Sequence, residues 1–176
     1  MNLWHDVNRK RITPENFLVC IEISKGSKTK YELDKETGAL ILDRILFTST
    51  HYPQNYGFIP RTYAGDLDPL DVLVLCSEPI QPLALIEAYP IGVFKMIDGG
   101  MIDEKIIAIT KHDPVYSAYQ DMKDLPDHLF QEMRHFFQVY KMLEGKDTFV
   151  SQVEGKDEAI AIIAASLKHY EEQFED

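Results

Sequence analysis

A chain of 176 residues, 45% of them hydrophobic, is long enough to bury one core and too short to make two domains the simpler interpretation. Its 18 Lys and Arg against 29 Asp and Glu give a net charge of -11, which argues against general nucleic-acid binding because that requires many phosphates to be neutralised. The longest apolar run, residues 159–165, is far shorter than the roughly 20 residues that a membrane span needs. We therefore expect one domain, residues 1–176, with neither a nucleic-acid nor a membrane partner.

The two cysteines, Cys20 and Cys76, lie in or beside apolar strand-like runs and lack Cys-x-x-Cys spacing. Such cysteines are typical of buried, reduced thiols. Residues 1–11 are polar and of mixed charge, unlike a secretory signal. The sequence therefore predicts a cytoplasmic protein.

Strand-like segments occupy the first two thirds of the chain, with glycines between them. The predicted strands are Phe17–Ile23, a segment that opens at Leu40, Asp71–Leu75, Ile91–Met96 and Lys105–Ile109.

The last third shows helical spacing. After Pro126, apolar residues recur every three or four positions at Leu129, Met133, Phe136, Tyr140 and Leu143. A second helix is predicted from the same spacing at Ile160, Ile163, Leu167 and Tyr170. Strands followed by helices favour an α+β, mainly β domain, most economically a small closed or nearly closed barrel with helices packed outside.

Three carboxylates are crowded into one short loop, residues 66–71, with the sequence Asp-Leu-Asp-Pro-Leu-Asp, directly before an apolar strand. Like charges a few ångströms apart raise one another's pKa, so this crowding is costly unless cations neutralise it. Pro69 stiffens the loop, and hard carboxylate oxygens on a rigid loop suit Mg²⁺ or Mn²⁺. Aspartates between strands most often form a solvated turn, but a third carboxylate at the strand entrance favours a metal site.

A second acidic turn follows a later strand, where Asp98 and Asp103 flank residues 99–101 and Lys105 comes two positions on. Taken alone, a hairpin with Asp and Gly at its tip is usually structural. The same holds for other polar residues on the strand-like segments and the first predicted helix: Lys30, Glu32, Arg44, Tyr140 and Lys141.

In this order, the segments resemble the soluble family I inorganic pyrophosphatases. The resemblance spans roughly residues 22–141 and rests on Lys30-Tyr31-Glu32, Arg44, the segment 52–60 with its Tyr-Pro-x-Asn-Tyr-Gly motif, the acidic loop 66–71, residues 95–98, Asp103 with Lys105, and Tyr140-Lys141. It implies a five-stranded, OB-like closed barrel with flanking C-terminal helices, and hydrolysis of pyrophosphate to two phosphates. Mg²⁺ is the implied cofactor, with Mn²⁺ as a possible substitute. A homo-oligomer is also implied, commonly a hexamer in bacterial members of this length.

The resemblance implies a role for each acidic residue. Asp66, Asp71 and Asp103 would hold two Mg²⁺ ions that share a water and lower its pKa toward neutrality. Asp68 is the implied general base, and Tyr56 would support the water and the ligands. Further implied metal ligands are Asp98 together with Asp103, and Glu32 for a weaker ion.

The implied substrate-binding residues supply positive charge and hydrogen-bond donors to the leaving phosphate. They are Lys30, Arg44, Lys105, Tyr140 and Lys141. Arg44 offers a planar fork to phosphate oxygens, whereas the lysines act as point charges. Glu22, on a strand with buried neighbours, is a candidate partner of the metal ligands.

Two positions depart from the family pattern. Leu67 stands where the family most often has glycine, and a positive φ there would cost leucine roughly 1 to 2 kcal/mol. We expect instead that the loop accepts an ordinary L-residue whose side chain lies on apolar surface. Residues 145–150 lack the expected tryptophan, and Phe149 is the candidate to fill similar space.

Two other classes of protein fit the sequence poorly. An EF-hand needs a ligand at loop position five and glycine at six, where this chain has Leu70 and Asp71. An oligonucleotide-binding barrel should interleave exposed aromatic and basic residues along its strands, but these strands are aliphatic. Two alternatives stay open: a related metal-dependent phosphohydrolase acting on another small polyphosphate, and a catalytically inactive metal- or anion-binding barrel.

Overall fold

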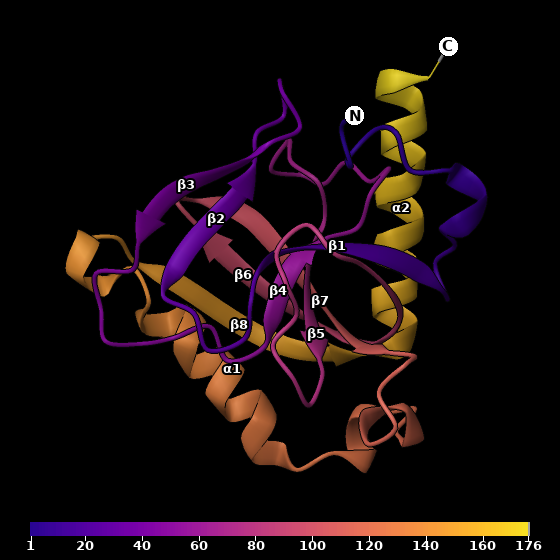
Figure 1. The fold of residues 1–176 in the computed structure, drawn as a ribbon. Helices are drawn as coiled ribbons and strands as arrows, with labels where there is room; N and C mark the ends of the chain where they lie inside the picture. Colours follow the sequence, from indigo (N-terminus) through magenta and orange to yellow (C-terminus); the bar gives the residue numbers. More distant parts are fainter. Residues whose placement is uncertain (176) are drawn as a thin grey trace.

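Five strands close on themselves in the computed structural model, which describes residues 1–175 (Figure 1). Around the ring they are β1 (Phe17–Ile23), β4 (Asn55–Phe58), β5 (Asp71–Leu75), β7 (Met101–Thr110) and β6 (Leu85–Asp98). The ring closes because β6 pairs back with β1, placing Phe17 opposite Ala88. A mainly β fold with a closed five-stranded ring and C-terminal helices is thus confirmed.

The two helices cover different parts of the ring. In Figure 1, α2 (Lys156–Phe174) runs along one side, and α1 (Asp127–Val139) lies below the other. Alternate residues of β5 enter the two resulting cores: Leu73 and Leu75 pack in the cluster that contains α1, and Val72 and Val74 in the cluster that contains α2. Both faces of this strand are covered, which explains its uninterrupted apolar sequence.

The β6–β7 hairpin confirms the predicted acidic turn. Gly99 and Gly100 form its two-residue tip with φ values of 58° and 80°, a conformation that glycine adopts without strain. The hairpin pairs Met96 with Asp103, and parallel pairing of β5 with β7 places Asp71 beside Lys105. These two registers bring acidic residues from separate segments to one end of the ring.

One predicted strand lies outside the ring. The segment that opens at Leu40 is β3 (Leu40–Ile45), which pairs with β2 (Thr29–Leu33) in a separate two-stranded sheet. Its place in the ring belongs to β4, whose four residues are too few to show a pattern. Gly57 is required in β4 because a Cβ there would lie 1.9 Å from the Cys20 carbonyl oxygen.

The last part of the chain differs from its helical pattern at two places. Both predicted helices form, but α1 ends at Val139, and Leu143 lies in the short 3-10 turn η4 (Met142–Glu144) with 69% of its surface exposed. The prediction that Leu143 continues the apolar face is wrong, because the chain leaves the helix and reverses at Gly145, whose φ is 70°. The unpredicted strand β8 (Thr148–Gly155) then pairs with the edge of β6.

The N-terminal segment, with the 3-10 turn η1 (Arg9–Arg11), packs against α2. Trp4 is buried there, and its ring meets Tyr170 and Phe174 of that helix. Cys20 and Cys76 are free and buried, as predicted. Within residues 1–175, neither helix combines the length and apolar character of a membrane span.

Candidate active site

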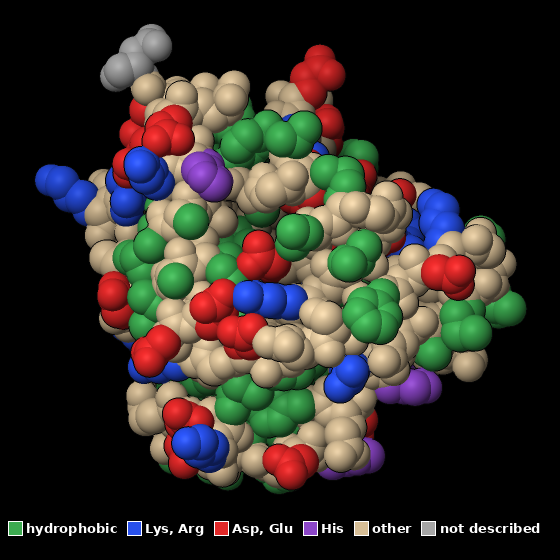
Figure 2. Space-filling view, turned by 180° about the vertical axis from the view of Figure 1, so that it is seen from behind, with side chains coloured by type: hydrophobic (Ala, Val, Ile, Leu, Met, Phe, Trp, Pro, Cys, Tyr) green, Lys and Arg blue, Asp and Glu red, His purple; other side chains and the backbone are tan. Residues whose placement is uncertain are grey.

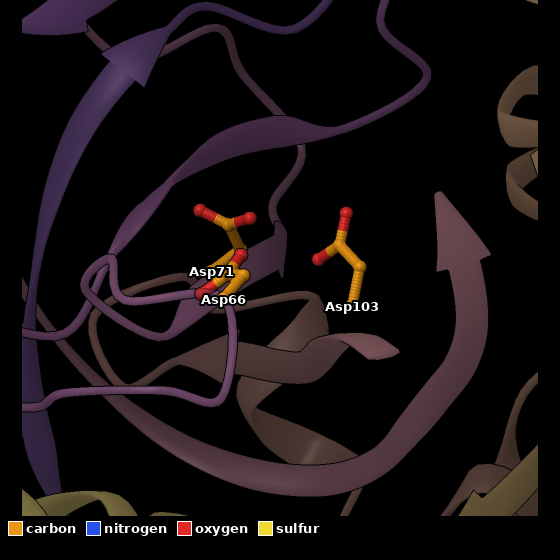
Figure 3. Close-up of side chains that lie close together, drawn as sticks. All are labelled: Asp66, Asp71 and Asp103. Atoms are coloured by element: carbon orange, nitrogen blue, oxygen red, sulfur yellow. The ribbon is translucent and has the colours of Figure 1, made fainter. Parts of the chain in front are cut away.

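Three carboxylates from separate elements converge at one end of the ring (Figure 3). Asp66 comes from the loop before β5, Asp71 begins β5, and Asp103 lies on β7. Each offers an oxygen within 4.8 Å of the others, so they form an acidic group that could bind a metal cation. An all-oxygen donor set of this kind suits a hard divalent cation.

The raised pKa values of Asp66 and Asp103 agree with a site that could bind a cation. Burial, then the charges of Asp71 and Asp103, raise the pKa of Asp66 to about 7. Burial also raises the pKa of Asp103, with Lys105 opposing and Asp71 adding to the shift. Because the carboxylates repel one another in a poorly hydrated place, a bound cation would be strongly favoured there.

Lys105 is the buried cation of this group. Only 2% of its surface is exposed, and Nζ donates to Asp71 Oδ2 at 2.9 Å, to both oxygens of Asp103 at 3.1 Å and to the Tyr56 hydroxyl at 2.9 Å. Burial favours the neutral amine, but Asp103 and Asp71 outweigh it and raise the pKa of Lys105. Lys105 therefore stays charged and neutralises part of the acidic group.

A small polar cavity of about 130 Å³ adjoins the acidic group. Its lining includes Glu22, Lys30, Glu32, Lys35, Tyr56, Asp68 and Asp71. Asp68 therefore faces the same space as Asp71 and Tyr56, and its carboxylate forms an ion pair with Lys35.

The β2–β3 hairpin carries Lys30 and Arg44 as directly paired residues. Lys30 Nζ lies 2.8 Å from Asp43 Oδ2 and 3.8 Å from Glu32 Oε2. Arg44 pairs with Asp43 and, through Nε at 2.9 Å, with Glu144 Oε1. Burial opposes its charge, yet Asp43 and then Glu144 raise the pKa of Arg44.

Tyr140 and Lys141 directly follow α1. Lys141 forms an ion pair with Asp98 at the end of β6 and also lies over the Tyr140 ring. Burial raises the pKa of the Tyr140 phenol, and the charges that act on it most are those of Lys105 and Asp98. The phenol therefore stays neutral and lies within the field of the acidic group.

The structure gathers all of the residues singled out in the sequence around this end of the ring. Hydrogen bonds of Lys105 join Asp71, Asp103 and Tyr56, and a carboxylate oxygen of Asp66 lies within 4.8 Å of Asp71 and Asp103. The cavity adds Lys30, Glu32 and Asp68. Asp98, next to the tip of the β6–β7 hairpin, forms an ion pair with Lys141, whose ammonium lies over the Tyr140 ring. Glu144 ties Arg44 to the same segment of the chain.

Some neighbours of these residues were missed by sequence reasoning. Lys35 forms an ion pair with Asp68, and Glu144 forms one with Arg44. No local sequence motif predicts either tertiary contact. Tyr52 is buried with its ring on Tyr56, a position that its place in the Tyr-Pro-x-Asn-Tyr-Gly segment could have indicated.

The buried Glu22 lines the cavity and accepts the Leu33 N–H at 2.8 Å. Burial raises the pKa of Glu22 to about 8 although that hydrogen bond opposes the shift. Glu22 thus lines the same cavity as Asp71, whose charge adds to the raised pKa of Glu22.

Two expectations about the departures from the family pattern are wrong. Leu67 has a φ of 67° and is 63% exposed, because a tight turn in which Ala64 N–H donates to Asp68 O places it in the left-handed region. Its side chain therefore does not pack on apolar surface. Phe149 is 62% exposed on the outer strand β8 and fills no core space.

One end of the closed five-stranded ring carries an acidic group that could bind a metal, a buried lysine and further cationic side chains. These features define a class of proteins that bind metals and anions. Within that class the comparisons are specific, because residues 19–171 match the family model described as inorganic pyrophosphatase. The chain belongs to the inorganic pyrophosphatase family.

Individual relatives agree along nearly the full chain. The chain is 50% identical to soluble inorganic pyrophosphatase PPA1 of Solanum tuberosum over 96% of its length and 80% of the relative. The inorganic pyrophosphatase structure from Thermus thermophilus superposes with a TM-score of 0.91 at 37% identity, covering 97% of this chain and 99% of that one. For the Helicobacter pylori enzyme the TM-score is 0.87 at 43% identity, covering 90% and 95%.

Proposed function

We propose that this protein is an inorganic diphosphatase that hydrolyses pyrophosphate to two phosphates. The convergence of Asp66, Asp71 and Asp103 beside the buried Lys105 carries the proposal, because it offers a cation site adjoining a small polar cavity. Membership of the family and the names of its relatives support the same reaction.

The proposed cofactor is Mg²⁺, with Mn²⁺ as a substitute. Asp66, Asp71 and Asp103 would hold it, Asp98 would join Asp103 for further ions, and Glu32 would hold a weaker one. When bound, Mg²⁺ supplies positive charge to the diphosphate and makes a coordinated water more acidic. The all-oxygen donors and the raised pKa of Asp66 support this choice.

Asp68 is the proposed general base. Its carboxylate lines the cavity next to the acidic group and accepts the proton of the attacking water. Tyr56, whose hydroxyl is 2.9 Å from Lys105 Nζ, orients the groups around that water. The ion pair with Lys35 holds Asp68 toward the cavity.

The remaining cationic and phenolic groups bind the substrate. Lys30 and Arg44 come from the β2–β3 hairpin, Lys105 from β7, and Tyr140 and Lys141 from the end of α1. Charge approaching from these three directions offsets the negative charge that develops on the leaving phosphate. The anion and its products would displace internal partners such as Asp43 and Asp98 from these side chains.

Assembly and location complete the proposal. We place residues 1–176 in one domain that forms a homo-oligomer, with a hexamer as the candidate state. Large apolar side chains reach the surface at several places, as Figure 2 illustrates for one face, and Leu42, Phe47, Ile102 and Phe149 are each more than half exposed. Free buried cysteines suit a reducing cytoplasm.

Phosphate release from pyrophosphate, measured across Mg²⁺ and Mn²⁺ titrations with a chelator control, tests the function. We expect rapid release that chelation abolishes and that ATP or a phosphomonoester does not match. Faster release from another polyphosphate would favour a related phosphohydrolase. A folded protein that binds phosphate but releases none from any substrate would be an inactive anion-binding member of the family.

A further inference from the structure

Glu144 is a buried carboxylate that the proposed reaction leaves without a role. It lies in η4, and only 8% of its side chain is exposed. Its Oε1 lies 2.9 Å from Nε of Arg44, a residue on β3 that comes 100 positions earlier in the sequence. A buried carboxylate is costly unless it is paired. The ion pair with Arg44 therefore offsets the cost of burying the Glu144 carboxylate.

The contact leaves one side of each partner free among the described residues. Glu144 Oε2 is buried without a hydrogen-bond partner, and so are Arg44 Nη2 and Nε, because the 2.9 Å contact of Nε with Glu144 Oε1 is an ion pair without hydrogen-bond geometry. Arg44 Nη1 meets Asp43, and Nε meets Glu144. The guanidinium thus has ion-pair contacts at Nη1 and Nε, while Nη2 has no protein partner. A buried unpaired donor is expected to gain from an incoming acceptor such as a phosphate oxygen.

The position of η4 gives the contact a second consequence. This turn comes directly after Tyr140 and Lys141, so the segment that carries one substrate-binding lysine also carries the carboxylate that holds Arg44. Lys141 is tied in turn to Asp98 of the β6–β7 hairpin. Glu144 therefore links the β2–β3 hairpin to the chain segment that follows α1.

We propose that Glu144 is a positioning residue that fixes the Arg44 guanidinium with its free donor toward the substrate phosphate. It touches neither the substrate nor the metal and acts only through Arg44. The inference rests on the proposed role of Arg44 in binding phosphate. A purely structural Glu144 would tie η4 to β3 without affecting how phosphate is bound.

The experiment uses the full chain and combines Glu144→Gln with Arg44→Lys in a double-mutant cycle. Glu144→Gln keeps the side-chain volume and removes the charge. We expect it to raise KM for pyrophosphate at saturating Mg²⁺ by about threefold to tenfold while kcat changes less than about twofold. In the Arg44→Lys background the same change should alter KM by less than about twofold, because the fork that Glu144 orients is already lost.

A second arginine–glutamate pair, more exposed than Arg44 and Glu144, serves as a control at the far side of the molecule. Arg9 Nε lies 3.0 Å from Glu171 Oε1, the same pair of atom types, on α2 away from β3 (Figure 1). Glu171→Gln should leave KM and kcat unchanged. Urea unfolding of each variant separates a loss of fold from a loss of binding, and Glu144→Asp, which keeps the charge with a shorter reach, should give a KM between wild type and Glu144→Gln.

Inorganic phosphate binding, followed by calorimetry, separates this inference from the proposed reaction. If wild type releases no phosphate from pyrophosphate, the proposed function fails, yet weaker phosphate binding by Glu144→Gln than by Glu171→Gln would still support the positioning role. An unchanged KM and phosphate affinity in Glu144→Gln would overturn it. So would an equal change in KM in the wild-type and Arg44→Lys backgrounds.

Discussion

Asp71 and Lys105 lie side by side on the parallel strands β5 and β7, with Lys105 Nζ 2.9 Å from Asp71 Oδ2. This contact places a permanent positive charge among carboxylates that are also the candidate metal ligands. The lysine therefore limits repulsion in the metal-free protein and stands beside the space where a diphosphate would bind.

Replacing Lys105 by methionine should destabilise the metal-free protein. The change leaves Asp71 and Asp103 partly buried without their cation, and breaking a buried ion pair costs about 3 to 5 kcal/mol. Urea unfolding with a chelator at pH 8 measures this loss. Added Mg²⁺ should restore part of it, because the metal replaces the missing positive charge. A variant as stable as wild type in the chelator would contradict the role given to Lys105.

The raised pKa of Asp66 predicts how metal binding depends on pH. With a pKa of about 7 against an ordinary value of 3.8, Asp66 is protonated in the metal-free protein below neutrality. Mg²⁺ must then displace a proton, so its affinity should rise from pH 6 to pH 7 and level off above pH 8. Calorimetry in two buffers of different ionisation enthalpy would detect the released proton. Equal affinity at pH 6 and pH 8 would refute the shift.

The same shift gives a stability trend with a definite sign. Because folding raises the pKa of Asp66, its contribution to stability is present below about pH 4 and is lost as pH rises toward 7 in the metal-free protein. Asp113 provides the opposite case. Although burial opposes ionisation, hydrogen bonds from Ser77 and from the Val115 and Tyr116 N–H groups lower its pKa, so its contribution is lost as pH falls.

Asp68→Asn should keep the fold and lower turnover by roughly 10²- to 10⁴-fold, the range that a positioned general base contributes. Asp68 lies in an accessible loop, where an amide fits in place of the carboxylate. Glu36→Gln, on the exposed turn of the β2–β3 hairpin, is the control for loss of one nearby negative charge. Turnover close to that of wild type, in a variant with native circular dichroism, would exclude Asp68 as the base.

Sequence patterns predicted the long, repetitive elements and the crowded acidic loop. Apolar continuity was sufficient for β1 and β5, and three-to-four-residue spacing for both helices. Apolar continuity was insufficient to predict β4, because this strand has only four residues and one of them is Gly57, which its close contact with Cys20 requires. Short elements depend on tertiary contacts, and these leave weak local signals.

In the candidate site, too, the sequence predicted some features and left out those that depend on tertiary contacts. Charged residues in a recognisable order could be assigned together, whereas the partners that hold them could not. Lys35 and Glu144 contact Asp68 and Arg44 only because the β2–β3 hairpin folds over the acidic loop and against η4. Backbone conformation was also hidden: nothing in the identity of Leu67 revealed that its turn requires a positive φ.

Leu67→Gly should therefore stabilise the protein. The left-handed conformation costs leucine roughly 1 to 2 kcal/mol, whereas glycine adopts it freely but loses about 0.4 to 1 kcal/mol through the greater entropy of its unfolded chain. The expected net gain in the free energy of unfolding is between zero and about 1.6 kcal/mol, since the exposed side chain gives up little burial. Leu143→Gly, at an exposed leucine without a positive φ, should destabilise instead. If both variants lose stability equally in urea, the strain assigned to Leu67 is absent.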